Sequence, residues 1–225
     1  MQLDLLYANR FDARDEAFKA RVWAILWRRV FSRWIGAEDV LLDVGGGYCE
    51  LANAARTRRR IVVDLNPQAP RHAAPGVEVH LASAEEMGFL GDGEVDVVFS
   101  SNFFEHLPDK PSLTRVLGEM RRVLRPGGRL LAVGPNVRLM PGSYWDYYDH
   151  HLPLSDRSLA EALLMCGFAL ERVDPRFLPA TTRSRLPRWP WLVEAWLALR
   201  PLSSLVTGRQ FLLVARRPAE GWRGP

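Results

Sequence analysis

Apolar positions in this chain follow two patterns that take turns along the sequence. Short, almost wholly apolar runs predict buried strands, and apolar residues three or four positions apart predict amphipathic helices. The predicted strands are residues 40–44, 60–65, 77–81, 95–100, 129–134, 168–173 and 211–215. The predicted helices are residues 18–34, 50–56, 112–124 and one that begins at Ser155 or Ser158 and ends at Met165. Because strands alternate with helices, we expect a parallel sheet.

Composition and charge indicate a single globular domain and disfavour nucleic acid as a partner. The 225 residues suit one α/β domain with additions, and 48% of them are apolar and 25% charged. The net charge is +4, but no run of basic residues is longer than Arg58–Arg60, so nucleic acid is not favoured as a partner. Cys49 and Cys166 form neither a metal-binding spacing nor a disulfide framework.

The two ends of the sequence bear on location. The first twelve residues lack the pattern of a secretory signal, and no run approaches the roughly 20 apolar residues that span a bilayer. We therefore expect a cytoplasmic protein. In residues 183–206, tryptophans and leucines are interleaved with arginines, which is typical of a helix lying at a membrane surface. The segment suits peripheral contact with the inner face of the membrane. Alternatively, it packs on the sheet, covers the ligand pocket or forms a dimer contact.

A glycine run follows the first predicted strand. Asp43 and Val44 end the strand, and Gly45, Gly46 and Gly47 lead through Tyr48 and Cys49 to a helix start. Glycine has no Cβ, so a ligand can lie directly against the backbone. The free N–H groups and dipole of the helix start would then face that ligand.

Three further segments stand at strand ends, where ligands bind in open parallel sheets. Asp64 ends the second strand, where an acid accepts both hydroxyls of a ribose, and Leu65 follows it. Ser83, Ala84 and Glu85 follow the third strand and suit an adenine edge; Ser83 is also a helix-cap candidate. Ser101 and Asn102 follow the fourth strand, where their oxygens suit an ammonium group.

Together these motifs resemble class I S-adenosylmethionine-dependent methyltransferases, of the type 11-like group. The resemblance rests on LLDVGGGYCE, VVDLNP, LASAEEM, VDVVFSSNFFEHL and RRVLRPGGRLL, in that order over about residues 40–135. It implies a Rossmann-like, seven-stranded, mostly parallel sheet with helices on both faces and an antiparallel last strand. It also implies that Asp43 and Gly45–Gly47 hold the methionine portion of S-adenosylmethionine, with Tyr48 beside them. Asp64 would hold the ribose, Ala84 would flank the adenine, and Ser101 and Asn102 would face the amino-acid end.

One position departs from this pattern, and the sequence also disfavours one other cofactor. The third glycine usual in the loop is Cys49 here, which we interpret as a small space-filling residue. A nicotinamide dinucleotide site would require glycine at position 50, which is Glu50, so that alternative is disfavoured.

Candidate acceptor-side residues follow the fourth and fifth strands. His106 lies in the first loop, and the second contains Tyr144, Trp145, Asp146, His150 and His151. Imidazole suits a general base near neutral pH, so the catalytic candidates are His150 and His151, followed by His106. Tyr144, Trp145 and Asp146 suit a sugar-type acceptor, although a packed aromatic cluster has the same composition. Asp146, Asp149, His150 and His151 also suggest a metal site, but adjacent ligands are a weak signal and we predict none.

The sequence thus predicts a methyltransferase. Residues 1–39 would form a helical cover, 40–217 the methyltransferase domain with 183–206 as an added helical segment, and 218–225 a tail. The methyl group would pass to an oxygen, less readily a nitrogen, of a small-molecule or glycan acceptor. A looser resemblance to bacterial methyltransferases of glycan and exopolysaccharide gene clusters favours a saccharide, free or lipid-linked. The alternative is a non-catalytic protein that binds S-adenosylmethionine and docks at a membrane or complex. The sequence leaves the oligomeric state open.

Overall fold

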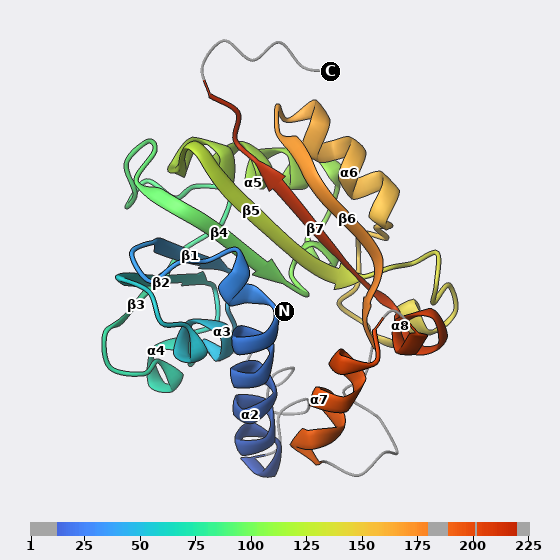
Figure 1. The fold of residues 1–225 in the computed structure, drawn as a ribbon. Coiled ribbons are helices and arrows are strands. Elements are labelled where there is room, and N and C mark those ends of the chain that lie inside the picture. Colours follow the sequence, from blue (N-terminus) through green and yellow to red (C-terminus); the bar gives the residue numbers. More distant parts are fainter. Residues whose placement is uncertain (1–12, 180–188, 201, 220–225) are drawn as a thin grey trace.

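Seven strands form a single sheet in the order β3-β2-β1-β4-β5-β7-β6 (Figure 1). The computed structural model describes residues 13–179, 189–200 and 202–219. The strands are β1 (Val40–Val44), β2 (Arg59–Asp64), β3 (Val77–Leu81), β4 (Val95–Ser101), β5 (Leu124–Pro135), β6 (Ala169–Leu178) and β7 (Gln210–Arg216). Neighbours from β3 to β5 pair in parallel, and β7 pairs antiparallel with both β5 and β6. The expected mostly parallel Rossmann-like sheet, with its last strand antiparallel, is confirmed.

Helices cover both faces of this sheet. They are α2 (Ala13–Arg29), α3 (Glu50–Ala54), α4 (Ala69–His72), α5 (Lys110–Val123), α6 (Asp156–Met165), α7 (Pro190–Ala198) and α8 (Leu202–Thr207). Three short 3-10 turns are η1 (Phe31–Arg33), η2 (Phe104–His106) and η3 (Ser143–Asp146).

The two faces follow from the period-two alternation of strand side chains. On β1, Leu42 belongs to a core formed with α5 and α6, whereas its neighbour Leu41 packs in a second core with α2, η1 and α3. Figure 1 shows α5 and α6 on the side of the sheet away from α2 and α3. Because both faces are covered, β1 is buried along its whole length, as its apolar run predicts.

Two helix boundaries differ from the sequence prediction. The first helix was expected over residues 18–34, but α2 ends at Arg29 and the chain continues into the separate turn η1. The fourth helix begins after Ser155, and Ser158 is not its cap but the third residue of the helix. The side chains of Ser155 and Ser158 each accept a hydrogen bond from the backbone N–H of the other. Serine thus takes the third helical position, which glutamate or glutamine usually occupies in such a capping box.

The start of β5 also differs from the prediction. The strand predicted over residues 129–134 is longer in the structure, where β5 already begins at Leu124 and includes the Arg125–Gly128 segment. The pairing with β4 shifts register between Val95 and Val97, which is a β-bulge. Within it, Gly127 has a φ of +81°, and a Cβ on Gly128 would lie 2.9 Å from the carbonyl oxygen of Asp96.

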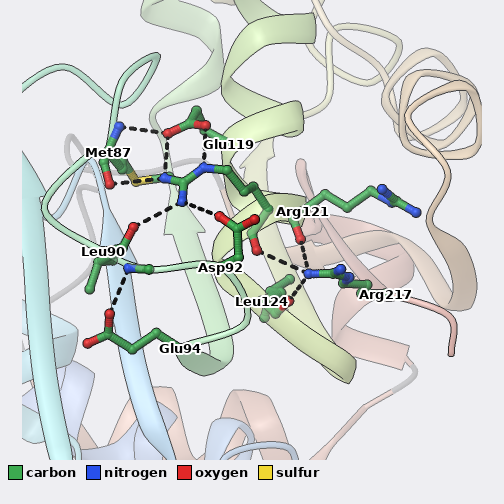
Figure 2. A network of polar contacts seen from close by, with 10 residues as sticks. Met87, Leu90, Asp92, Glu94, Glu119, Arg121, Leu124 and Arg217 are labelled. Atoms are coloured by element: carbon green, nitrogen blue, oxygen red, sulfur yellow. Dashed lines mark hydrogen bonds and ion pairs between the residues drawn. The ribbon is translucent and has the colours of Figure 1, made fainter. Parts of the chain in front are cut away.

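Arginine side chains form hydrogen bonds and ion pairs at the end of the sheet where β4 begins (Figure 2). The guanidinium of Arg122 donates to the backbone carbonyls of Met87 and Leu90 and pairs with Asp92 and Glu119. This network joins the segment before β4 to the end of α5. The opposite end of the sheet, where the parallel strands end, is therefore the end at which we expect a site.

The predicted segment 183–206 contains two short helices in its described part rather than one amphipathic helix. Residues 183–188 and 201 lie outside the described residues. The helix α7 packs beside α2, and Glu194 pairs with Arg28 and Arg29 at 2.5 and 2.9 Å (Figure 1). Of the helices described, none has the length and apolar character needed to cross a membrane. The domain limits and cytoplasmic location stay predictions, and residues 1–12 and 220–225 lie outside the described part.

Candidate functional site

The glycine loop after β1 is pressed against its neighbours, so side chains are excluded there. Gly45 has a φ of +70°, and a Cβ at this position would lie 2.4 Å from a ring carbon of Phe103. A Cβ on Gly46 would lie 2.7 Å from Cγ1 of Val62. The N–H of Gly45 donates to the carbonyl of Val63 at 2.9 Å, which ties the loop to β2. The backbone at the end of β1 is therefore closely packed and held in place, and its three glycines are half-buried.

Cys49 occupies the position at which the family pattern has a third glycine. Its φ is +61°, in the left-handed region that favours glycine. The side chain is buried, and its Sγ lies 3.5 Å from the carbonyl oxygen of Ala69. Burial, with the nearby charge of Asp43 and other acids, raises the pKa of the thiol to about 12. A neutral, enclosed thiol fits the predicted space-filling role.

Three acidic side chains gather around this loop. Asp43 is only 3% exposed, and burial, reinforced by the charges of Glu50 and Asp64, raises its pKa to about 8. Burial likewise raises the pKa of Glu50. Acids that destabilise one another's charged forms are relieved by a positively charged ligand. The cluster therefore favours a cation at the end of β1.

Asp64 is held in position by the backbone on both sides. One carboxylate oxygen accepts the N–H of Gly47 at 2.7 Å, and the other accepts the N–H of Asn66 at 2.7 Å. The carboxylate thus bridges the glycine loop and the turn after β2, and is half-buried. Each oxygen keeps a second lone pair for a ligand hydroxyl. Sequence position alone would not show that this acid also fixes the glycine loop.

The remaining predicted cofactor residues lie in loops after the same strands. Leu65 is exposed, and the ring of Tyr48 stacks on His72 at 3.9 Å between centroids. Ser83 caps a turn rather than a helix, its Oγ accepting the N–H of Glu85 at 3.1 Å. The Glu85 carboxylate pairs with Arg115 of α5 at 2.5 Å.

Asn102 leaves β4 in a strained conformation that aims its side chain across the sheet edge. Its φ is +50°, and its N–H donates to the carbonyl of Val133 at 2.9 Å. The side-chain amide donates to Ser101 at 3.1 Å and accepts from Gln210 of β7 at 3.2 Å. Positive φ in a residue other than glycine is a mark of functional sites.

The acceptor-side histidines divide into a cluster and an exposed residue. The rings of His106 and His150 lie 5.2 Å apart, and His150 stacks on Tyr147 at 4.8 Å. The ring of His151 is exposed, although its N–H donates to the carbonyl of Glu105 at 2.8 Å. The structure therefore brings two of the three predicted catalytic histidines together.

The carboxylate of Asp149 is the partner of His106, which was not assigned a partner from the sequence. Nδ1 of His106 lies 3.1 Å from Oδ2 of Asp149 and 3.0 Å from its carbonyl oxygen. Burial disfavours the charged imidazole, but Asp149 and the charge of Glu105 outweigh it and raise the pKa of His106. In the sequence, only the adjacent Glu105-His106 pair after a strand end indicates that His106 has an acidic neighbour.

The three predicted substrate residues have different surroundings. Tyr144 is fully buried, and its hydroxyl donates to the carbonyl of Leu152 at 2.5 Å. Trp145 and Asp146 are exposed. Tyr144 thus packs within the loop, beside the ring of His150 at 4.8 Å, while its two neighbours face outward.

Comparison with known proteins finds a family that is similar over this site. Residues 42–132 match the family described as a methyltransferase domain. This similarity supports a class I methyltransferase domain within the chain. The matched residues run from β1 into β5 and so include the glycine loop, Asp64 and Asn102.

Relatives of this methyltransferase domain come from several bacteria. An uncharacterized methyltransferase of Mycobacterium sp. (strain KMS) is 41% identical over 138 residues, which cover 55% of this chain and 52% of the relative. A probable S-adenosylmethionine-dependent methyltransferase of Mycolicibacterium smegmatis is 30% identical over 162 residues, covering 70% and 62%. The chain thus spans about half the length of the first of these relatives.

Solved structures show the same fold. A chain from the complex of the Haloferax volcanii Trm112 methyltransferase activator with a methyltransferase superposes with a TM-score of 0.69 at 20% identity. The superposition covers 94% of this chain and 96% of that one. Family and fold imply S-adenosylmethionine as the cofactor. The residues fit it: the acidic cluster suits its positive charge, Asp64 its ribose, and the glycine loop close backbone contact.

The raised pKa of Asp43 predicts a pH-dependent stability. The folded-state pKa of about 8 exceeds the usual value of 3.8, so folding favours the protonated acid. The stability from this group is fully present below about pH 4 and is lost as pH rises through 8. We expect Asp43→Asn to raise the ligand-free unfolding free energy by on the order of 3 kcal/mol at pH 9, with little change near pH 4.5.

Urea unfolding of both proteins at the two pH values measures this difference. Asp92→Asn is the matched control, because the Asp92 side chain is 78% exposed at the opposite edge of the sheet. An equal effect of Asp43→Asn at both pH values would contradict the expected burial of a protonated acid.

Proposed function

We propose that this protein transfers a methyl group from S-adenosylmethionine to an oxygen of a small-molecule or saccharide acceptor. The observation that carries the proposal is the junction between the two halves of the site. Phe103 lies against Gly45 of the cofactor loop, and the next three residues form η2, which contributes His106 to the histidine cluster. An acceptor held at the cluster would therefore lie beside the cofactor.

The protein must align the acceptor oxygen with the methyl group and remove the proton of the hydroxyl. The acceptor oxygen forms a bond to the methyl carbon as the bond from that carbon to the sulfonium breaks, and the sulfonium becomes a neutral thioether. Holding the two reactants in line supplies much of the rate acceleration. The proton of the hydroxyl must leave, and His106 and His150 are the groups placed to receive it.

A saccharide acceptor, free or lipid-linked, is the class we favour. Trp145 and Tyr148 are exposed, and Asp146 lies beside them on the same loop. Flat rings stack on sugar faces, and carboxylates accept hydrogen bonds from sugar hydroxyls. Nitrogen acceptors rank second.

Methyl transfer is expected to depend on His150. Transfer of labelled methyl from S-adenosylmethionine to a panel of monosaccharides and lipid-linked saccharides should fall about 100-fold or more in His150→Ala, the size typical of lost acid–base catalysis. Binding of S-adenosylhomocysteine, measured by calorimetry, should stay nearly unchanged, because His150 lies in the acceptor-side cluster. Full transfer by the variant would remove the histidine cluster from the reaction.

A second candidate is a non-catalytic, cofactor-binding protein that docks at a membrane. The observation that favours it is the set of large apolar side chains exposed on and around α7 and α8. They are Trp189, Trp191, Leu199, Leu202, Leu205 and Val206. Flotation of the full chain with anionic liposomes, compared with a Leu202→Ser and Val206→Ser variant, tests it. No flotation of the native protein rejects membrane docking, and methyl transfer to any acceptor rejects the non-catalytic reading.

A further inference from the structure

The histidine cluster contains a ligand set for a metal ion. Glu105, His106 and His150 each offer one ligand atom, and these atoms lie within 4.8 Å of one another. Two imidazoles and a carboxylate are ligands typical of divalent zinc, iron and related ions. Ligands about 2.1 Å from such an ion lie roughly 3–3.5 Å apart, so shifts of about 1 Å would close the set.

Neighbouring groups contact two of these ligands and restrict their movement. Nδ1 of His106 is engaged by Asp149, whose side chain is buried, so Nε2 is the nitrogen left for an ion. A carboxylate behind a ligating imidazole is the usual outer partner in metal sites. The ring of His150 is stacked on Tyr147 and lies against Tyr144.

The backbone joins the two segments that supply the ligands. The carbonyl of Glu105 accepts the N–H groups of both His151 and Leu152, at 2.8 and 3.1 Å. The turn after β4 and the loop after β5 are therefore fixed to each other directly beside the ligand atoms. A site whose ligands come from two connected, rigid segments loses little entropy when an ion binds.

We propose that Glu105, His106 and His150 bind a divalent transition-metal ion on the acceptor side of the site. The ion would take an oxygen of the acceptor as a further ligand and lower the pKa of its hydroxyl, and the proton would then pass to solvent water, because imidazoles bound to the ion cannot receive it. In the absence of an ion, the same histidines remain the proton acceptors. The role of the ion in the reaction rests on the proposed methyl transfer, whereas metal binding itself does not. The competing arrangement is a hydrogen-bonded cluster of the same groups that only stabilises the loop.

Cobalt binding to the full chain tests the proposal. After the protein is treated with a chelator and dialysed, titration with Co²⁺ should produce visible absorption bands with one ion per chain, and Zn²⁺ should abolish them. His106→Ala, His150→Ala and Glu105→Gln should each weaken Co²⁺ binding at least 10-fold. The matched control is His151→Ala, because that exposed histidine lies next in sequence but outside the ligand set.

Folding of each variant is checked by circular dichroism, and Glu105→Gln keeps the shape of the side chain if the alanine variants unfold. Absence of Co²⁺ bands in the native protein, or equal affinity in folded Glu105→Gln, overturns the metal site and leaves the structural cluster. Since the readout is absorption, metal binding without methyl transfer to any acceptor would reject the proposed function alone.

Discussion

Replacing Asp64 by alanine is expected to weaken binding of S-adenosylhomocysteine about 100-fold. This factor follows from the free energy that hydrogen bonds to a charged group contribute to binding. The change removes the two bonds that the carboxylate accepts from Gly47 and Asn66 and, on the expected binding mode, the acceptor for the ribose hydroxyls. The glycine loop then loses a tie to the turn after β2. Isothermal calorimetry measures the effect.

Two comparisons make the Asp64 result specific. Asp64→Asn keeps the size of the side chain and one acceptor oxygen but removes the charge, so its loss should be smaller than that of alanine. Asp92→Ala removes an acid at the far edge of the sheet and should bind as the native protein does (Figure 2). If the native protein binds no S-adenosylhomocysteine, the assigned cofactor is wrong; if Asp64→Ala binds fully, only the role of this residue is wrong.

Gly45→Ala is expected to cost on the order of 3 kcal/mol of folding free energy, from positive φ and overpacking together. The Cβ would lie 2.4 Å from the half-buried Phe103 ring and 2.8 Å from the Cβ of Phe103, so the ring and the loop backbone must both shift. Cofactor binding should fall as well, because the loop must shift to relieve the contact. Urea unfolding and calorimetry measure the two effects.

Two further variants test this explanation. One is a control substitution at another glycine, and the other is a background substitution at Phe103 that relieves the steric conflict. A Cβ on Gly142 would meet nothing within 4 Å, so Gly142→Ala should change stability by less than about 0.5 kcal/mol. In a Phe103→Gly background, which removes both the ring and the Cβ that would lie 2.8 Å away, the added cost of Gly45→Ala should shrink to the part due to φ alone. An undiminished cost in that background would contradict steric exclusion by Phe103.

Much of the fold was predictable because local patterns agree with the tertiary arrangement. The apolar run at Val40–Val44 reads as a strand buried on both faces, and the sheet places it between β2 and β4. The failures occur where distant contacts decide a boundary. The β5 bulge exists because Gly128 packs against β4, and proline and glycine in the sequence indicate only a turn.

The sequence by itself determined the sheet, the methyl-donor motifs and the order of the strand-end segments, because each depends on local periodicity or on spacing along the chain. Only the tertiary structure decided which histidines share a cluster. His106 and His150 are 44 positions apart, and the carbonyl of Glu105 joins their segments while leaving the ring of His151 exposed. It also decided that position 49, a cysteine, has the left-handed backbone. Both depend on packing between remote segments, which no local pattern encodes.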